Sequence, residues 1–151
     1  MEPLICVILR TLMYLCAVIL FRYVFCFWNK RDIMATIHLT DEQFRKRIAD
    51  YSKSSDRFEF LGSRPAVVDF YAAWCGPCKM LSPVFEEVSG EYAGKVDFYK
   101  VNVEEEEKLA SFFGVRSIPT LVFIPINGNY RIVQGAIGKP QLKQAVDEIL
   151  L

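Results

Sequence analysis

The sequence predicts an α/β domain built on a central mixed β-sheet with helices on both faces, preceded by a hydrophobic N-terminal segment. Apolar, strand-like runs alternate with helical patterns along residues 36–151, an order typical of α/β domains. The run AVVDFYA at 66–72 is nearly continuous in apolar and β-branched residues, which indicates a strand buried on both faces. The last two strand-like runs flank Asn127 and Gly128, a dipeptide favoured in hairpins, so part of the sheet is expected to be antiparallel.

Composition limits the functions open to the chain. Its 151 residues include 18 Lys or Arg and 18 Asp or Glu, so the formal net charge is zero. This length suffices for one well-packed domain, and there is no basic excess for binding nucleic acid. One domain over residues 34–151 is therefore expected, without a nucleic-acid partner.

Residues 1–33 form an apolar segment that is considered separately. A membrane-spanning helix needs about 20 mostly apolar residues, and such a window here places Arg10 or Arg22 within the hydrocarbon or near its edge. If the segment is inserted, the basic residues that follow it keep the domain in the cytoplasm by the positive-inside rule. Alternatively, Met34 is the natural start and residues 1–33 are an over-extended reading of the gene. Both interpretations stay open, and the domain is expected in the cytoplasm.

The expected elements alternate along the chain: strands at 36–39, 66–72 and 96–103 and two within 120–135, and helices over 41–51, 77–94, 104–114 and 139–151. Thr40 and Gln43 form a capping box at the start of the first helix. Pro77 suits the first turn of the second helix, and Gly114 ends the third.

Two further helical features concern the surface and the core. The last helix is amphipathic, with Leu142, Val146 and Ile149 on one stripe that is expected to face the sheet. The acidic run 104–107 is interpreted as a solvated face near a helix N-terminus, where negative charge is favourable, and not as a metal site.

The residues that carry chemistry are Cys75 and Cys78, separated by Gly76 and Pro77. Such a pair can hold a metal, lock the fold or cycle between dithiol and disulfide. The other three cysteines lie in the apolar N-terminal segment, so the domain is not a disulfide-stapled scaffold. A structural zinc site needs four ligands, and His38 is the only histidine and is distant in sequence. Metal binding is therefore not expected.

The position of the pair favours thiol–disulfide exchange. Cys75 follows a buried strand and begins a helix, where unpaired amides and the macrodipole stabilise a thiolate. Cys78 lies about one turn later on the same face, close enough to form the disulfide. Exchange needs this asymmetry, because one sulfur attacks a substrate disulfide and the other resolves the mixed disulfide.

The segment VDFYAAWCGPCK at 68–79, the later SIPT at 117–120, and two glycines, Gly128 and Gly135, together resemble the thioredoxin family over essentially all of 34–151. The resemblance implies the thioredoxin fold and protein-disulfide reductase activity without a bound cofactor. It further implies disulfide-containing protein substrates and recycling by a thioredoxin reductase, which supplies electrons from NADPH.

The resemblance also assigns roles to residues of the exchange site. Cys75 resembles the attacking thiol and Cys78 the buried resolving thiol. Asp69 resembles the buried carboxylate that accepts the Cys78 proton, and Lys100 resembles its lysine neighbour. The residues agree with this, because a carboxylate within an apolar strand should have a raised pKa, which suits a general base. The alternative is that Asp69 only pairs structurally with Lys100.

Further residues resemble those that tune the site or bind substrate. Gly76 and Pro77 are implied to set a reducing potential. Trp74, Ile118, Pro119 and Gly135 are implied to form the substrate groove. Pro119 resembles the family's cis-proline, which leaves the backbone of Ile118 free to pair with an extended substrate. The alternatives are an ordinary aromatic contact for Trp74, a surface turn for Pro119 and a bare turn requirement for Gly135.

The chain departs from the family pattern at three positions. Tyr71 stands where tryptophan is common, Ser117 replaces a common glycine, and Gln134 replaces a common apolar residue. The last two affect the expected docking rim, so partner choice stays open. Two other functions also stay open at this point. One is a membrane-anchored extracytoplasmic thiol reductase of the cytochrome c maturation type, and the other is a non-catalytic binding module that uses the groove.

Overall fold

The computed structural model describes residues 36–51, 58–127 and 129–151. The N-terminal segment 1–33, most of the polar connector and Gly128 lie outside these residues, so the interpretations that concern them are not tested. The described elements are β1 (Thr36–His38), α2 (Asp41–Arg47), β2 (Ala66–Tyr71), α3 (Gly76–Glu91), β3 (Asp97–Asn102), α4 (Glu107–Phe112), β4 (Thr120–Ile124), β5 (Arg131–Gln134) and α5 (Lys139–Leu150).

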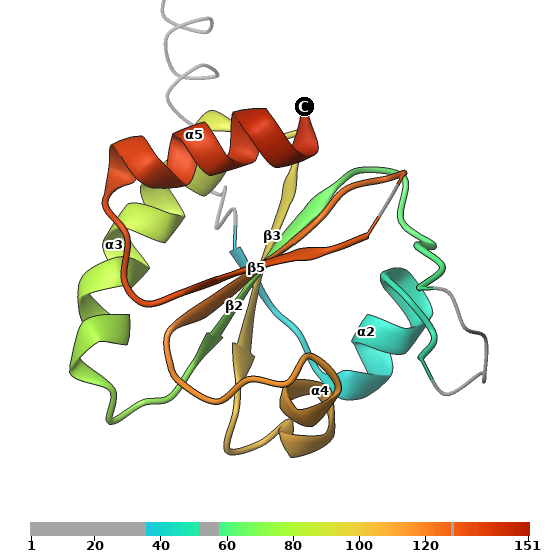
Figure 1. Cartoon of the computed structure of the whole chain (residues 1–151), viewed down its shortest axis with the longest axis horizontal. Coiled ribbons are helices and arrows are strands. Elements are labelled where there is room, and N and C mark those ends of the chain that lie inside the picture. The colour runs from blue at the N-terminus through green and yellow to red at the C-terminus, as the bar shows by residue number, and fades with distance from the viewer. Residues whose placement is uncertain (1–35, 52–57, 128) are drawn as a thin grey trace, which may run out of the picture. The chain divides into compact units, whose positions relative to one another are not determined.

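The five strands form one mixed sheet in the order β1-β3-β2-β4-β5 (Figure 1). β1, β3 and β2 run parallel, whereas β4 and β5 are antiparallel to their neighbours. The predicted mixed sheet is therefore confirmed. β2 is central, and its register places Asp69 between Lys100 of β3 and Leu121 of β4.

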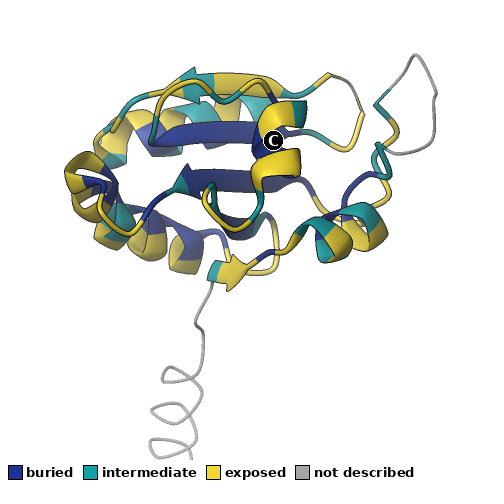
Figure 2. Cartoon of the chain, turned by 90° about the horizontal axis from the view of Figure 1, so that it is seen from below, coloured by how far each residue is buried: buried dark blue, intermediate teal, exposed yellow. Residues whose placement is uncertain are grey.

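Helices cover both faces of the sheet, as predicted, and alternate residues of β2 serve the two faces. Val68 and Phe70 pack against a cluster that includes residues of α2 and α4, and Val67 packs against α3 and α5. Figure 2 shows the central strands as buried, with the exposed residues of the helices turned outward. The predicted apolar stripe of α5 also lies against this second cluster through Leu142 and Val146.

The helix α2 begins as predicted but ends earlier than the predicted range 41–51. Its N-terminus carries the predicted capping box between Thr40 and Gln43. The helix was expected to extend to residue 51, but it ends at Arg47. The Ala49 amide donates to the Phe44 carbonyl at 3.2 Å, five residues back, which breaks the four-residue spacing of α-helical hydrogen bonds. The next carbonyl, that of Ile48, accepts the Leu61 amide at 2.7 Å.

The helix α4 is shorter at its beginning than the predicted range 104–114. The Glu104 amide donates to the Asn102 side chain, and the Glu105 and Glu106 amides donate to the Asn102 carbonyl. These bonds hold the first acidic residues in a turn, and the helix begins at Glu107. Gly114 follows the helix with a φ of +63°, a conformation that glycine adopts readily, so the predicted stop is confirmed.

The predicted hairpin is present as the antiparallel pair β4 and β5. Its connection covers residues 125–130 and is longer than a two-residue turn around Asn127. Pro125 follows β4 directly and has no amide hydrogen to donate to a neighbouring strand, which explains why the pairing ends there.

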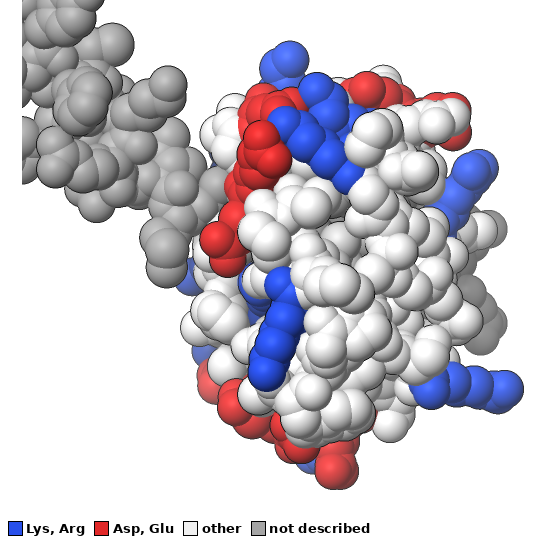
Figure 3. All heavy atoms as spheres, turned by 90° about the vertical axis from the view of Figure 1, so that its left-hand side faces the viewer, with Lys and Arg blue, Asp and Glu red and all other residues white. Residues whose placement is uncertain are grey.

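Ion pairs link α3 to α5 at the surface. Lys139 lies 2.7 Å from carboxylate oxygens of both Glu87 and Glu91, and Lys143 lies 2.6 Å from Glu91. Figure 3 shows acidic and basic side chains side by side on this side of the molecule. These contacts fix α3, which begins at the cysteine pair, against the last helix. Among the described residues, no helix combines the length and apolar composition needed to cross a membrane.

Candidate active site

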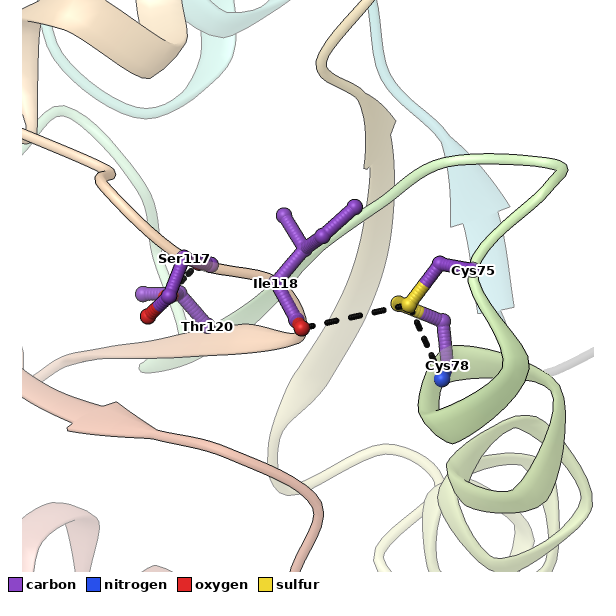
Figure 4. Close-up of a disulfide and its surroundings, with 5 residues drawn as sticks. All are labelled: Cys75, Cys78, Ser117, Ile118 and Thr120. Atoms are coloured by element: carbon purple, nitrogen blue, oxygen red, sulfur yellow. Dashed lines mark hydrogen bonds between the residues drawn. A yellow bond between two sulfur atoms is a disulfide. The ribbon is translucent and has the colours of Figure 1, made fainter.

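Cys75 and Cys78 form a disulfide at the start of α3, with their Cα atoms 5.3 Å apart (Figure 4). β2 ends at Tyr71, and the Cys75 amide then donates to the Ala72 carbonyl in a tight turn. Cys75 is the N-cap of α3, and Pro77 lies in the first turn, where a missing amide hydrogen costs nothing. The prediction that Cys75 lies at a helix N-terminus is confirmed.

The surroundings of the two sulfurs differ more in polarity than in exposure. Cys75 is 4% exposed and Cys78 is 3% exposed, so burial does not separate an attacking thiol from a resolving one. The Cys75 sulfur, however, accepts the backbone N–H of Cys78 at 3.2 Å. This amide and the helix dipole stabilise negative charge on Cys75.

The loop before β4 faces the disulfide. The Cys75 sulfur lies 3.9 Å from the carbonyl oxygen of Ile118 (Figure 4). The Ile118–Pro119 peptide bond is cis, the geometry that the resemblance predicts. The hydroxyl of Thr120, the first residue of β4, donates to the Ser117 carbonyl at 2.6 Å and so ties the loop to the start of the strand.

Gly135 lies beside the same loop. Its amide donates to the Pro119 carbonyl at 2.8 Å, and its φ of +90° is one that side chains with a Cβ rarely adopt. The turn at this position therefore does favour glycine, as the alternative interpretation from the sequence proposed. The structure also places Gly135 against the loop that faces the disulfide.

Trp74 lies at the rim of the site and is 68% exposed. Its indole N–H donates to the Glu104 carboxylate at 2.9 Å. The sequence interpretation of the acidic run as a purely solvated face missed this contact, because 30 positions separate the two residues. A hollow of about 220 Å³ opens beside the tryptophan; it is lined by Trp74, Val103, Ala110, Val115, Arg116, Ser117 and Ile118.

Asp69 lies on β2 with its side chain fully buried. Neither carboxylate oxygen accepts a hydrogen bond from any residue that the structure describes. Burial raises the pKa of Asp69 to about 7, and the positive charge of Lys100 opposes this rise. The raised pKa that the apolar strand predicts is confirmed.

Lys100 is the register partner of Asp69 and is only 8% exposed. Its ammonium donates to the Ser82 hydroxyl, lies 4.0 Å from the Glu86 carboxylate, and is 5.2 Å from the ring centre of Tyr71. Because Asp69 accepts no hydrogen bond from it, the geometry does not support a simple structural pair of Asp69 and Lys100. Within the described part of the chain, no group of three or more His, Cys, Asp or Glu side chains is placed to hold a metal ion.

Comparisons with known proteins agree with this site. A family model described as Thioredoxin matches residues 35–148. The thioredoxin of Borreliella burgdorferi is 43% identical over 112 residues, which cover 74% of this chain and 95% of that protein. The thioredoxin of Alicyclobacillus acidocaldarius is 38% identical over 116 residues, covering 77% and 99%. The thioredoxin of Haemophilus influenzae is 47% identical over 85 residues, covering 56% and 78%. The chain belongs to the thioredoxin family of protein-disulfide oxidoreductases.

Proposed function

We propose that the protein reduces disulfides in other proteins by cycling Cys75 and Cys78 between dithiol and disulfide, and that a thioredoxin reductase restores the dithiol with electrons from NADPH. The observation that carries this proposal is the Cys75–Cys78 disulfide, which lies at the N-terminus of α3 and faces the Ile118–Pro119 loop. No resident cofactor is required, because the two thiols themselves supply the two electrons.

The reaction proceeds in two exchange steps. The Cys75 thiolate attacks one sulfur of the substrate disulfide, forms a mixed disulfide and releases the first substrate thiolate. Cys78 then attacks the Cys75 sulfur, which forms the intramolecular disulfide seen in the structure and releases the second substrate thiolate. The two released thiolates take up protons, and the substrate gains the two electrons that the dithiol loses.

Asp69 serves as the general base for the second step. Cys78 must lose its proton before it attacks, and a carboxylate with a pKa of about 7 can accept a proton near neutral pH. Lys100, the neighbour of Asp69 in the sheet, modulates that pKa through its charge. Asp69→Asn should slow turnover at neutral pH and leave the fold intact, whereas unchanged kinetics would defeat this assignment.

The substrate docks across the rim of the disulfide. The backbone of Ile118 pairs with an extended substrate segment, as in other forms of strand addition, while Pro119 and Gly135 shape the turn beside it. Trp74 offers an exposed aromatic surface to the partner. Gly76 and Pro77, between the two cysteines, set a reducing potential.

The domain, residues 34–151, acts in the cytoplasm. The basic residues that follow the apolar N-terminal segment support this location if the segment is a membrane anchor. Mass spectrometry of the native protein distinguishes the two interpretations of the segment, because peptides from upstream of Met34 would rule out an internal start. The relatives reported above are named thioredoxins, which does not favour the cytochrome c maturation type of reductase or a purely binding role.

Insulin reduction tests the proposal. The full chain, NADPH and a thioredoxin reductase are mixed with insulin, and NADPH oxidation is followed beside the Cys75→Ser variant. We expect turnover with the wild-type chain and none above background with Cys75→Ser. Activity with dithiothreitol but not with the reductase would overturn the proposed electron donor and leave the exchange chemistry in place. No activity with either donor would overturn the proposed function.

A further inference from the structure

Asp69 and Lys100 are paired across neighbouring strands, but their side chains make no hydrogen bond to each other. Their strands, β2 and β3, are hydrogen-bonded neighbours, and the two residues are register partners on the face of the sheet that α3 covers. Neighbouring strands are about 4.8 Å apart, so a lysine side chain is long enough to reach the carboxylate beside it. Both Asp69 oxygens nevertheless accept no hydrogen bond from the residues that the structure describes.

Other groups hold the Lys100 ammonium. It donates to the Ser82 hydroxyl on α3, and the Glu86 carboxylate lies 4.0 Å away. Ser82 and Glu86 are four residues apart on one helix and therefore share a face. The ring of Tyr71, whose centre is 5.2 Å from the ammonium, adds a cation–π contact. Three groups thus attract the ammonium toward themselves.

The charge of Lys100 matters because, within the described part of the chain, few other charges face Asp69. β4 contributes Leu121, an apolar register partner. β1 contributes His38, which neighbours Lys100 in the sheet and has a ring nitrogen 3.3 Å from the Tyr71 hydroxyl. From α3, the Cys75–Cys78 disulfide carries no charge, and the charge of Glu86 faces the ammonium. Among the residues that the structure describes, Lys100 is the charged group that moves the pKa of Asp69, and its charge lowers that pKa.

We propose that Ser82 is a positioning residue, whose hydroxyl, together with Glu86, holds the Lys100 ammonium away from the Asp69 carboxylate and so keeps Asp69 able to take up a proton near neutral pH. This inference deepens the proposed function and rests on the role of Asp69 as base for Cys78. Without the hydroxyl, the ammonium turns to the carboxylate and stabilises its charged form.

The direct test is a titration of Asp69 in the oxidised full-length chain, followed by the carbon NMR signal of its carboxyl group. An opposite charge within hydrogen-bonding reach lowers the pKa of a carboxyl group by roughly 1–3 units. We therefore expect the Asp69 midpoint to fall by about 1 pH unit in Ser82→Ala. Alanine is a strong helix former, so α3 should be retained. Ser82→Thr keeps a hydroxyl and should restore most of the wild-type midpoint.

Ser89→Ala is the matched control. Ser89 also lies on α3, where it is buried while Ser82 is half-buried, and its hydroxyl donates to the Glu86 backbone carbonyl within the helix and not to the lysine side chain. Its removal should leave the Asp69 midpoint unchanged. A shift in Ser89→Ala as large as that in Ser82→Ala would mean that any disturbance of α3 moves the midpoint, and would overturn the proposal.

A double-mutant cycle with Lys100→Met shows whether Ser82 acts through the lysine. In that background, Ser82→Ala should no longer lower the Asp69 midpoint. The proposal is overturned if the midpoint does not fall in Ser82→Ala alone, or if it falls equally without Lys100. Because the titration uses the oxidised protein and needs no turnover, its outcome is independent of the insulin assay. In that assay the acid limb of the pH profile should move to lower pH in Ser82→Ala and stay in place in Ser89→Ala.

Discussion

The two faces of the sheet are built from the same strands, but one packs mainly apolar and aromatic side chains against its helices and the other also buries charged side chains. On the face of α2 and α4, aromatic rings pack closely: Phe113 lies 5.6 Å from both Phe44 and Phe70 and 4.9 Å from Tyr130, between ring centres. On the face of α3 and α5, an apolar cluster around Phe85 adjoins a buried carboxylate and a buried ammonium.

This difference shows how a small domain can bury charge without losing its core. Because side chains alternate along β2, Val68 and Phe70 supply one face while Asp69 points to the other. The buried carboxylate, which destabilises the folded state when it is charged, therefore lies on the same face as the disulfide. Substitutions on the α3 face should therefore change chemistry and pH dependence, and those on the α2 face should change stability alone.

The largest effect is expected for Cys75→Ser. Serine is a good N-cap residue, so the variant keeps an oxygen able to accept the amide of the first turn of α3 and should fold normally. Insulin reduction should fall to the rate without protein, since no thiolate remains to attack. Circular dichroism checks the fold, and substantial remaining reductase activity would show that the chemistry is not centred on this face.

A large loss of stability without a loss of chemistry is expected for Phe44→Ala. Phe44 is fully buried on the α2 face and contacts the ring of Phe113. Removing such a side chain costs roughly 3–5 kcal/mol through lost burial and a cavity. Urea unfolding measures this cost. Below the unfolding transition, the rate per folded molecule should match the wild type; a selective loss of rate would mean that the two faces are not independent.

Asp69→Asn should remove a pH dependence of stability. Folding raises the pKa of this carboxyl from its ordinary 3.8 to about 7, so between these values the folded state binds more protons than the unfolded state. The free energy of unfolding should therefore fall as pH rises from about 4 to about 7, by about 4 kcal/mol at most, at about 1.4 kcal/mol per unit.

The asparagine side chain is uncharged at every pH in this range, so no charge is buried at position 69. The variant should therefore be more stable than the wild type at pH 8 and similar to it at pH 4. Urea titrations of both oxidised proteins at the two pH values provide the measurement. Parallel pH profiles for the two proteins would show that the buried carboxylate carries no such cost.

The smallest effect is expected for Thr40→Ala at the start of α2. The Thr40 side chain accepts the Gln43 amide in the capping box, and loss of such a cap costs about 1 kcal/mol. The urea midpoint should fall slightly and insulin reduction should not change. A changed pH profile of the reaction in this variant would contradict the separation of the two faces.

The sequence was sufficient to predict what depends on neighbours along the chain. The alternating strands, the cap at Thr40, the helix N-terminus at Cys75 and the raised pKa of Asp69 all follow from local pattern. The predicted end of α2 and the predicted beginning of α4 were wrong, because the Phe44 carbonyl took the Ala49 amide and Asn102 took the amides of the first acidic residues.

Contacts between segments that are distant in sequence could not be predicted from local sequence patterns either. Trp74 meets Glu104, and Lys100 meets Ser82, only after the strands and helices pack. A pattern of residue types indicates which groups are present, but not which of several partners an ammonium or an indole N–H selects.

The most direct test of the central claim is to trap the mixed disulfide. The reduced full chain carrying Cys78→Ser is incubated with insulin, and the covalent product is mapped by peptide mass spectrometry. If Cys75 attacks and Cys78 resolves, a substrate cysteine should remain linked to Cys75, and the Cys75→Ser chain should give no adduct at Cys78. An adduct at Cys78 in that control, or none at Cys75 in the trap, would contradict the account.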